Sequence, residues 1–146
     1  MKTEKLHISF DNFFDFKLIG ISCREKDYRL CWAINQSLGI DLIRLSNEGI
    51  ASRTHLTNFP FFEYINKETG SVYRLLSNRF ESKVLMKELK TIDFLFLLQG
   101  EDSNLHEIIK KLGSIEFVFL ATEIEIDKLK EKDLLYLQYD LITFKK

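Results

Sequence analysis

The strongest constraint on the fold is a strand–helix–strand pattern that occurs twice in the chain, over residues 16–45 and 92–121. In the first copy, short apolar runs at 16–21 and 40–45 predict strands. Between them, four apolar residues recur at helical spacing within 28–38: Leu30, Cys31, Ile34 and Leu38. Gly39 follows at the position where a helix end favours a left-handed residue. We therefore predict a helix between two strands.

The second copy begins with residues 92–98, which are nearly all apolar and predict a central strand covered on both faces. An apolar stripe then predicts a helix over 105–112: Leu105, Ile108, Ile109 and Leu112. Gly113 is expected to close this helix, and 115–121 predicts another strand.

Both helices have candidate start signals. Ser22 and Glu25 form a capping-box pattern before the first helix, and Asp27 is an alternative N-cap. Before the second helix there are three candidate caps: Asp102, Ser103 and Asn104.

A β-hairpin is predicted between the two copies. Aromatic and β-branched runs at 59–65 and 71–76 flank a five-residue loop, 66–70, that ends in Gly70. Pro60 has no donor for a ladder hydrogen bond, so we place it at the start of its strand or on an edge. Residues 46–58 are expected to form a loop with a short extended piece, and the polar, basic stretch 77–91 predicts no element.

These elements predict a single α+β domain over 1–146, with a mostly antiparallel sheet and two helices on one face. Two βαβ-like units with an inserted hairpin resemble a ferredoxin-like or ACT-like arrangement. In the tail, 122–146, residues 126–132 predict a short charged helix. The remainder of the tail matches helix and strand patterns equally well.

Charge and composition exclude several classes of protein. Hydrophobic residues make up 45% of the chain, which excludes a disordered protein. Net charge is -1, from 21 basic and 22 acidic residues, so we expect no nucleic-acid partner. No apolar run reaches the roughly 20 residues that a spanning helix needs, so no membrane partner is expected either. A start without a secretory signal and two cysteines outside any redox spacing favour the cytoplasm.

No metal site or cofactor is predicted from the sequence. His7, His55 and His106 lie far apart, and neither cysteine has a neighbouring ligand at metal spacing. The chain has no Gly-rich phosphate loop and no nucleophile elbow. We favour a core role for Cys31, and for Cys23 a role as a small buried residue over that of a nucleophile.

Glu88 and Asp93 are the candidate acid–base residues. Asp93 interrupts an apolar run and is a candidate general base. The alternative, which we favour, is that Asp93 binds backbone groups or pairs with a cation such as Arg29 or Arg74. An acid–base enzyme is therefore the hypothesis with the least support.

One face of the first helix combines aromatic and polar residues that are enriched in protein interfaces: Tyr28, Arg29, Trp32 and Gln36. Tyr28 and Trp32 are four residues apart and hence neighbours on the helix. The alternative, which we favour, is packing at the edge of the core, since tryptophan is usually largely buried. This face is the best candidate for a partner-binding surface in the sequence.

Residues 86–95, which include Glu88, Asp93 and Phe94, resemble the signature of the uncharacterised bacterial IPExxVDY family. Similar stretches extend the resemblance over roughly 16–135: Asp27–Leu30, Ile34-Asn35, Leu38–Ile40, Phe62–Tyr64, Leu76–Asn78 and Ile126–Lys130. Lys87 replaces the proline of the motif, Ile92 the valine and Phe94 the tyrosine. Three residues rather than two separate Glu88 from Ile92. The resemblance implies no known activity and supports only the fold.

Three functions remain as hypotheses. We favour a non-enzymatic protein-interaction module that acts as a homodimer. The alternative is a small-molecule-sensing regulatory domain with its pocket between the two helix–strand units. The third is an enzyme that uses Asp93 or Glu88.

Overall fold

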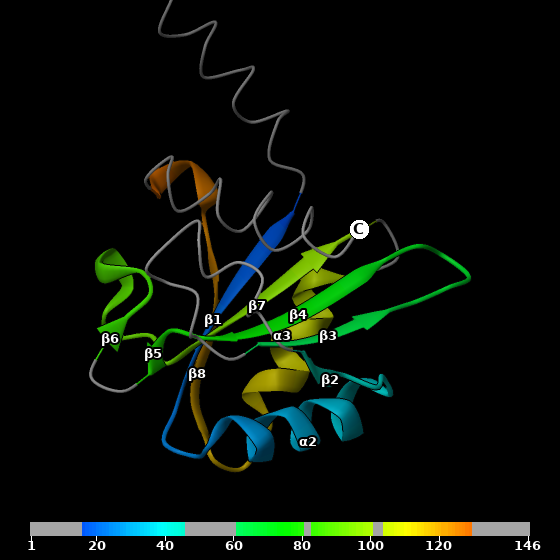
Figure 1. Ribbon diagram of the computed structural model, residues 1–146, viewed down its shortest axis with the longest axis horizontal. Coiled ribbons are helices and arrows are strands. Elements are labelled where there is room, and N and C mark those ends of the chain that lie inside the picture. The colour runs from blue at the N-terminus through cyan, green and yellow to red at the C-terminus, as the bar shows by residue number, and fades with distance from the viewer. Residues whose placement is uncertain (1–15, 46–60, 81–82, 101–103, 130–146) are drawn as a thin grey trace, which may run out of the picture.

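The computed structural model describes residues 16–45, 61–80, 83–100 and 104–129. An antiparallel sheet of six strands forms the centre of the fold (Figure 1). Two helices, α2 (Asp27–Leu38) and α3 (Leu105–Gly113), lie on one face of this sheet. The predicted α+β fold is therefore confirmed. In spatial order the strands are β2 (Ile43–Leu45), β3 (Phe61–Ile65), β4 (Val72–Ser77), β7 (Phe94–Gln99), β1 (Lys17–Cys23) and β8 (Val118–Ile124).

The two predicted strand–helix–strand units share this sheet. β1 pairs antiparallel with both β7 and β8, so β7 and β8 run parallel to each other on either side of it. In this register Ile19 lies opposite Phe96. The hairpin β3–β4 is inserted between β7 and β2. The two strands of the first unit, β1 and β2, are therefore separated by β7, β4 and β3. The hairpin forms as predicted, with Ile65 paired to Val72 and Gly70 at a φ of 81°, but β4 begins at Val72, one residue later than predicted.

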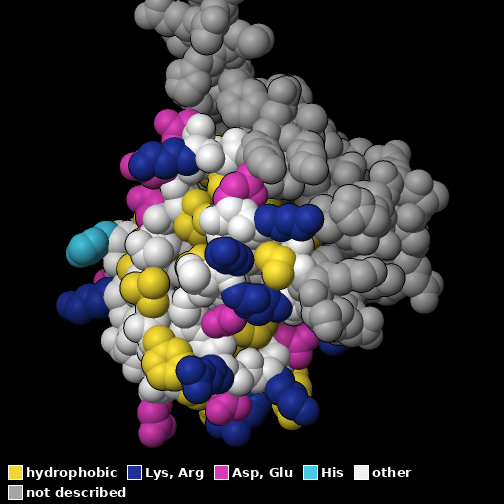
Figure 2. All heavy atoms as spheres, turned by 90° about the vertical axis from the view of Figure 1, so that its left-hand side faces the viewer, with side chains coloured by type: hydrophobic (Ala, Val, Ile, Leu, Met, Phe, Trp, Pro, Cys, Tyr) yellow, Lys and Arg dark blue, Asp and Glu magenta, His cyan; other side chains and the backbone are white. Residues whose placement is uncertain are grey.

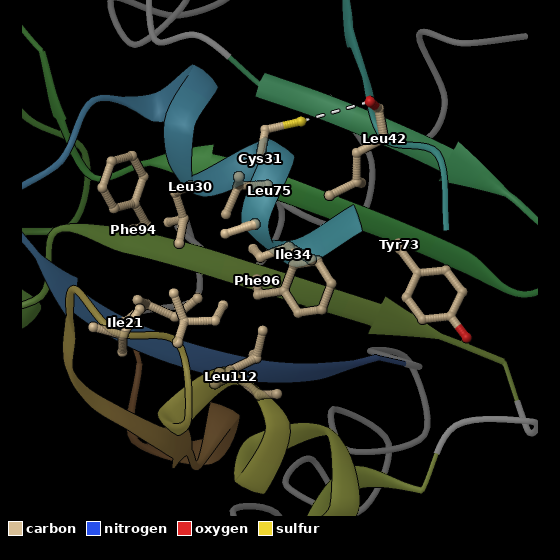
Figure 3. Packing of buried hydrophobic residues seen from close by; sticks show 14 of the residues in the cluster. Ile21, Leu30, Cys31, Ile34, Leu42, Tyr73, Leu75, Phe94, Phe96 and Leu112 are labelled. Atoms are coloured by element: carbon tan, nitrogen blue, oxygen red, sulfur yellow. Dashed lines mark hydrogen bonds between the residues drawn. The ribbon is translucent and has the colours of Figure 1, made fainter. Parts of the chain in front are cut away.

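Each face of the sheet carries a hydrophobic core. The larger core lies between the sheet and the two helices and includes Leu30 and Ile34 of α2 and Leu112 of α3 (Figure 3). On the opposite face, the second core contains Leu18, Leu97 and Met86 among others. Alternate residues of β7 enter each core, which confirms that this strand is covered on both faces.

The helix ends differ in part from the sequence predictions. The predicted capping box is wrong: Ser22 belongs to β1, and its hydroxyl donates to the carbonyl oxygen of Thr91 at 3.1 Å. The alternative N-cap, Asp27, is also wrong, because Asp27 is the first residue of α2 and Lys26 occupies the cap position, while Gly39 closes the helix with a φ of 67° as predicted. For α3, the cap among the three candidates is Asn104, whose Oδ1 accepts the Glu107 N–H at 3.2 Å. Gly113 is the last residue of α3 rather than its cap.

Three strands start two or three residues later than predicted, and in two of them other bonds hold the first residues. Both backbone groups of Leu42 bond to the Asn35 side chain, at 2.8 and 3.3 Å, so β2 begins only at Ile43. The Ile115 N–H donates to the Leu112 carbonyl at the end of α3 and the Val118 N–H to the Ile115 carbonyl, and β8 starts at Val118. β7 begins at Phe94 rather than at residue 92.

The tail divides at the end of β8. Residues 122–124, predicted as tail, complete β8, and a 3-10 turn, η3 (Ile126–Lys128), stands where the short helix was expected. The predictions for residues 46–58, Phe59, Pro60, His7, His55 and the tail beyond residue 129 lie outside the described residues. None of the described helices is long and apolar enough to span a membrane.

The stretch 77–91, which predicted no element, covers the second face of the sheet. It contains the short strands β5 (Arg79–Phe80) and β6 (Lys83–Val84) and a 3-10 turn, η2 (Lys87–Leu89). Leu85 and Met86 are buried in the second core. This cover is not predictable from the sequence, because residues 77–91 have neither helical nor strand periodicity.

Candidate interaction surface

The outward face of α2 presents the four side chains selected from the sequence. Tyr28 is 57% exposed and Trp32 66% exposed, and Arg29 and Gln36 are exposed as well. The opposite face of the helix is buried: Leu30, Cys31, Ala33 and Ile34. Packing of Trp32 at the edge of the core, the alternative in the sequence analysis, is therefore wrong.

Strand β8 adds two exposed apolar side chains. Phe119 is 71% exposed and Leu120 49% exposed. The Arg24 guanidinium lies 5.8 Å from the centre of the Phe119 ring, and that of Arg29 lies 5.5 Å from the centre of the Phe117 ring. Arginine over an aromatic face is an attractive arrangement that also holds the cation in place.

These contacts join the helix face to the start of β8. We define the aromatic–arginine surface as six residues: Arg24, Tyr28, Arg29, Trp32, Phe117 and Phe119. Gln36 continues the same helix face one turn beyond Trp32. Figure 2 shows the side of the molecule that is on the left in Figure 1, where hydrophobic side chains lie among basic and acidic ones. Aromatic residues and arginine, the residue types of the aromatic–arginine surface, are enriched in protein interfaces.

The structure places the two candidate acid–base residues in different settings. Glu88 is exposed in η2. Asp93 precedes β7, where its Oδ2 accepts the Cys23 N–H at 3.0 Å and its Oδ1 accepts from Nε of Arg79 at 3.2 Å. The favoured interpretation, backbone bonding plus a cation, is confirmed, but the predicted cations are wrong. Because Ser77 pairs with Phe94, the chain just after β4 brings Arg79 to Asp93.

Arg29 and Arg74 have other partners. Arg29 of α2 pairs with Glu25, which precedes the helix, at 3.5 Å, and Arg74 pairs with Glu63 inside the sheet. Phe94, the third residue of the predicted motif, is buried in the larger core. These placements give Asp93 and Phe94 structural roles at the start of β7.

Asn78, which was not predicted as a functional or structural residue, organises the cover on the second face of the sheet. Asn78 is fully buried, and its Nδ2 donates to the carbonyls of Leu89 and Ile92 at 2.9 and 2.8 Å. Its Oδ1 accepts the Met86 N–H at 2.8 Å. One side chain therefore fixes three backbone groups of the covering stretch. The only signal in the sequence is an asparagine directly after an apolar strand.

Both cysteines are free and buried. Burial raises the pKa of the Cys31 thiol from 9.0 to about 11, and the charges of Asp27 and Asp41 act in the same direction. Burial also raises the pKa of Cys23. The thiol of Cys31 donates to the Leu42 carbonyl at 3.5 Å (Figure 3). The predicted burial of Cys23 and Cys31 is confirmed, and their raised pKa values disfavour the reactive thiolate form.

Within the described residues, no group of three or more His, Cys, Asp or Glu side chains could hold a metal ion. A metabolite pocket between the two units stays a prediction. β1 and β7 pair directly there, and buried side chains pack between the sheet and the helices (Figure 3).

No protein-family model matches the chain, and no curated protein matches it.

Proposed function

We propose that the chain is a non-enzymatic protein-interaction module that acts as a homodimer. The observation that carries this proposal is the exposure of Phe119 and its neighbours on the aromatic–arginine surface. Exposed aromatic side chains gain free energy when a partner removes them from water, and arginine and tryptophan are enriched among the residues that dominate binding. A second copy of the chain is the proposed partner.

The mass of the full chain in solution tests the proposal. Light scattering after size-exclusion chromatography, from micromolar to submillimolar concentration, is expected to show a rise from the monomer mass of 17.3 kDa toward twice that value. A mass that stays at the monomer value throughout would contradict the homodimer.

A matched pair of variants tests the surface. Phe119→Ser removes the most exposed large apolar side chain in the described part of the chain, and we expect it to shift the equilibrium toward monomer. Ile43→Ser is the control, because Ile43 is 55% exposed on β2 at the opposite edge of the sheet. Equal effects of the two substitutions would argue against the aromatic–arginine surface.

We also propose a cytoplasmic location and membership of the IPExxVDY family. The free state of Cys23 and Cys31 supports the first, since reducing compartments keep thiols unpaired. The motif over residues 86–95 supports the second.

A further inference from the structure

The outer edge of β8 has the features of a strand that pairs with another strand. Within the described residues the sheet ends at β2 and β8, and β8 has seven residues where β2 has three. A long edge strand offers a row of backbone donors and acceptors to any second strand. Its side chains do not shield it, since Phe119, Leu120, Thr122 and Glu123 are all exposed.

A bulge limits the regular part of this edge. Cys23 pairs with Val118 and Ser22 pairs with Leu120, so Phe119 is an extra residue in the ladder. From Leu120 to Ile124 the register with β1 is continuous. A second strand therefore meets five regular residues, of which Thr122 is the central one.

The side chains of these five residues are complementary to a second copy of themselves. Leu120, Thr122 and Ile124 alternate along one face of the sheet, the face opposite the helices. When two copies pair antiparallel about Thr122, each Leu120 lies opposite Ile124 of the second copy and the two Thr122 side chains lie opposite each other. Apolar pairs and threonine pairs across strands are both favourable.

The charges along the edge favour the same antiparallel direction. At the start of β8, the Arg24 guanidinium stands over the Phe119 ring. Near its end lies the exposed carboxylate of Glu123, and just beyond the strand Glu125 pairs with Lys128 at 3.0 Å. An antiparallel pair places the basic end of one copy against the acidic end of the other, whereas a parallel pair would bring like charges together.

We propose that two copies of the chain associate through β8, paired antiparallel with Thr122 on the two-fold axis, so that their sheets become one continuous sheet. This inference rests on the proposed homodimer and names its interface. The occupant of the edge is the same strand of a second copy.

Disulfide trapping of the full chain tests this interface. Thr122→Cys places two thiols opposite each other across the axis, within the Cα separation of about 7 Å that a disulfide spans. Under mild oxidation we expect a covalent species of twice the monomer mass, lost on reduction. Ala121→Cys and Glu123→Cys are matched controls, because two residues at either position would be about 8 Å apart. The natural cysteines are buried and contribute little to cross-linking.

The outcomes separate this inference from the proposed function. Predominant cross-linking at Thr122 alone supports the β8 interface. A wild-type chain that is dimeric while Thr122→Cys stays uncross-linked overturns the interface and leaves the homodimer standing. Preferential cross-linking at Ala121 or Glu123 overturns the Thr122 axis. A wild-type chain that is monomeric at every concentration overturns both proposals.

Discussion

Glu63 and Arg74 form an ion pair inside the sheet. They are direct partners across β3 and β4, with Arg74 Nη2 2.5 Å from Glu63 Oε2, and both side chains are buried. Burial lowers the pKa of Arg74, while the charge of Glu63 opposes that shift. Nε and Nη1 of Arg74 have no hydrogen-bond partner among the described residues. Desolvation therefore offsets much of the attraction between the two charges.

We expect the single variant Arg74→Met to lose about 3–5 kcal/mol of unfolding free energy, because it removes the Arg74 guanidinium from the buried Glu63 carboxylate. The double variant Arg74→Met with Glu63→Leu should recover most of that loss, since it removes both buried charges of the pair. Urea denaturation of the wild type, both single variants and the double variant measures the coupling. A double variant whose loss equals the sum of the two single-variant losses would show that the two residues act independently.

This pair also marks a limit of sequence interpretation at the scale of single residues. Glu63 and Arg74 each interrupt an apolar run, but the composition of the runs does not say which charges meet. The partner of Arg74 follows from the hairpin register, in which Ile65 pairs with Val72 and Glu63 therefore with Arg74. Asp93 meets Arg79 for the same kind of reason, and the sequence analysis had assigned its cation wrongly.

At the scale of elements, periodicity predicts what local patterns encode. α2 and α3 were predictable because their apolar residues recur at helical spacing and a closing glycine or a capping residue adjoins each. The hairpin was predictable from its loop. The covering stretch 77–91 was not, because its conformation depends on hydrogen bonds from Asn78 to residues 8 to 14 positions away. The start of β2 escaped prediction likewise, because the Asn35 side chain binds Leu42.

We expect Asn78→Ala to release this covering stretch from the second face of the sheet. The substitution removes the partners of the Met86 N–H and of the Leu89 and Ile92 carbonyls, and we expect a loss of about 2–4 kcal/mol in unfolding free energy. Limited proteolysis should then cut within residues 79–91 before it cuts elsewhere in the described chain.

Asn66→Ala is the matched control for that substitution. The Asn66 side chain also bonds to backbone groups, but it lies in the exposed hairpin loop. Its Oδ1 accepts the N–H groups of Glu68 and Thr69. Water replaces an exposed partner, so we expect a loss of about 1 kcal/mol or less. A loss at Asn78 no greater than that at Asn66 would contradict the organising role of Asn78.

At the scale of the whole molecule, the arrangement of the strands determines which parts can bind. β1 and β7 lie inside the sheet, with a strand on each side and a core on each face. β8 lies at the edge of the described sheet, where it pairs with β1, and most of its side chains are exposed. The helix face with Trp32 was predictable as a candidate surface, whereas its continuation to Phe119 was not. That continuation depends on the register of β8 and on where Arg24 and Arg29 lie.

Hydrogen exchange of the full chain tests this division between interior and edge. Amides of β1 and β7 should exchange most slowly, at the free energy of global unfolding, because each strand is bonded on both sides. In the proposed dimer, amides on the outer edge of β8 should gain protection as the concentration rises from micromolar to submillimolar. Amides of β2 at the other edge should exchange at a constant rate, which makes β2 an internal control. Concentration-dependent protection of β2 instead of β8 would place the contact between copies at the wrong edge for the β8 interface, even if the chain is a dimer.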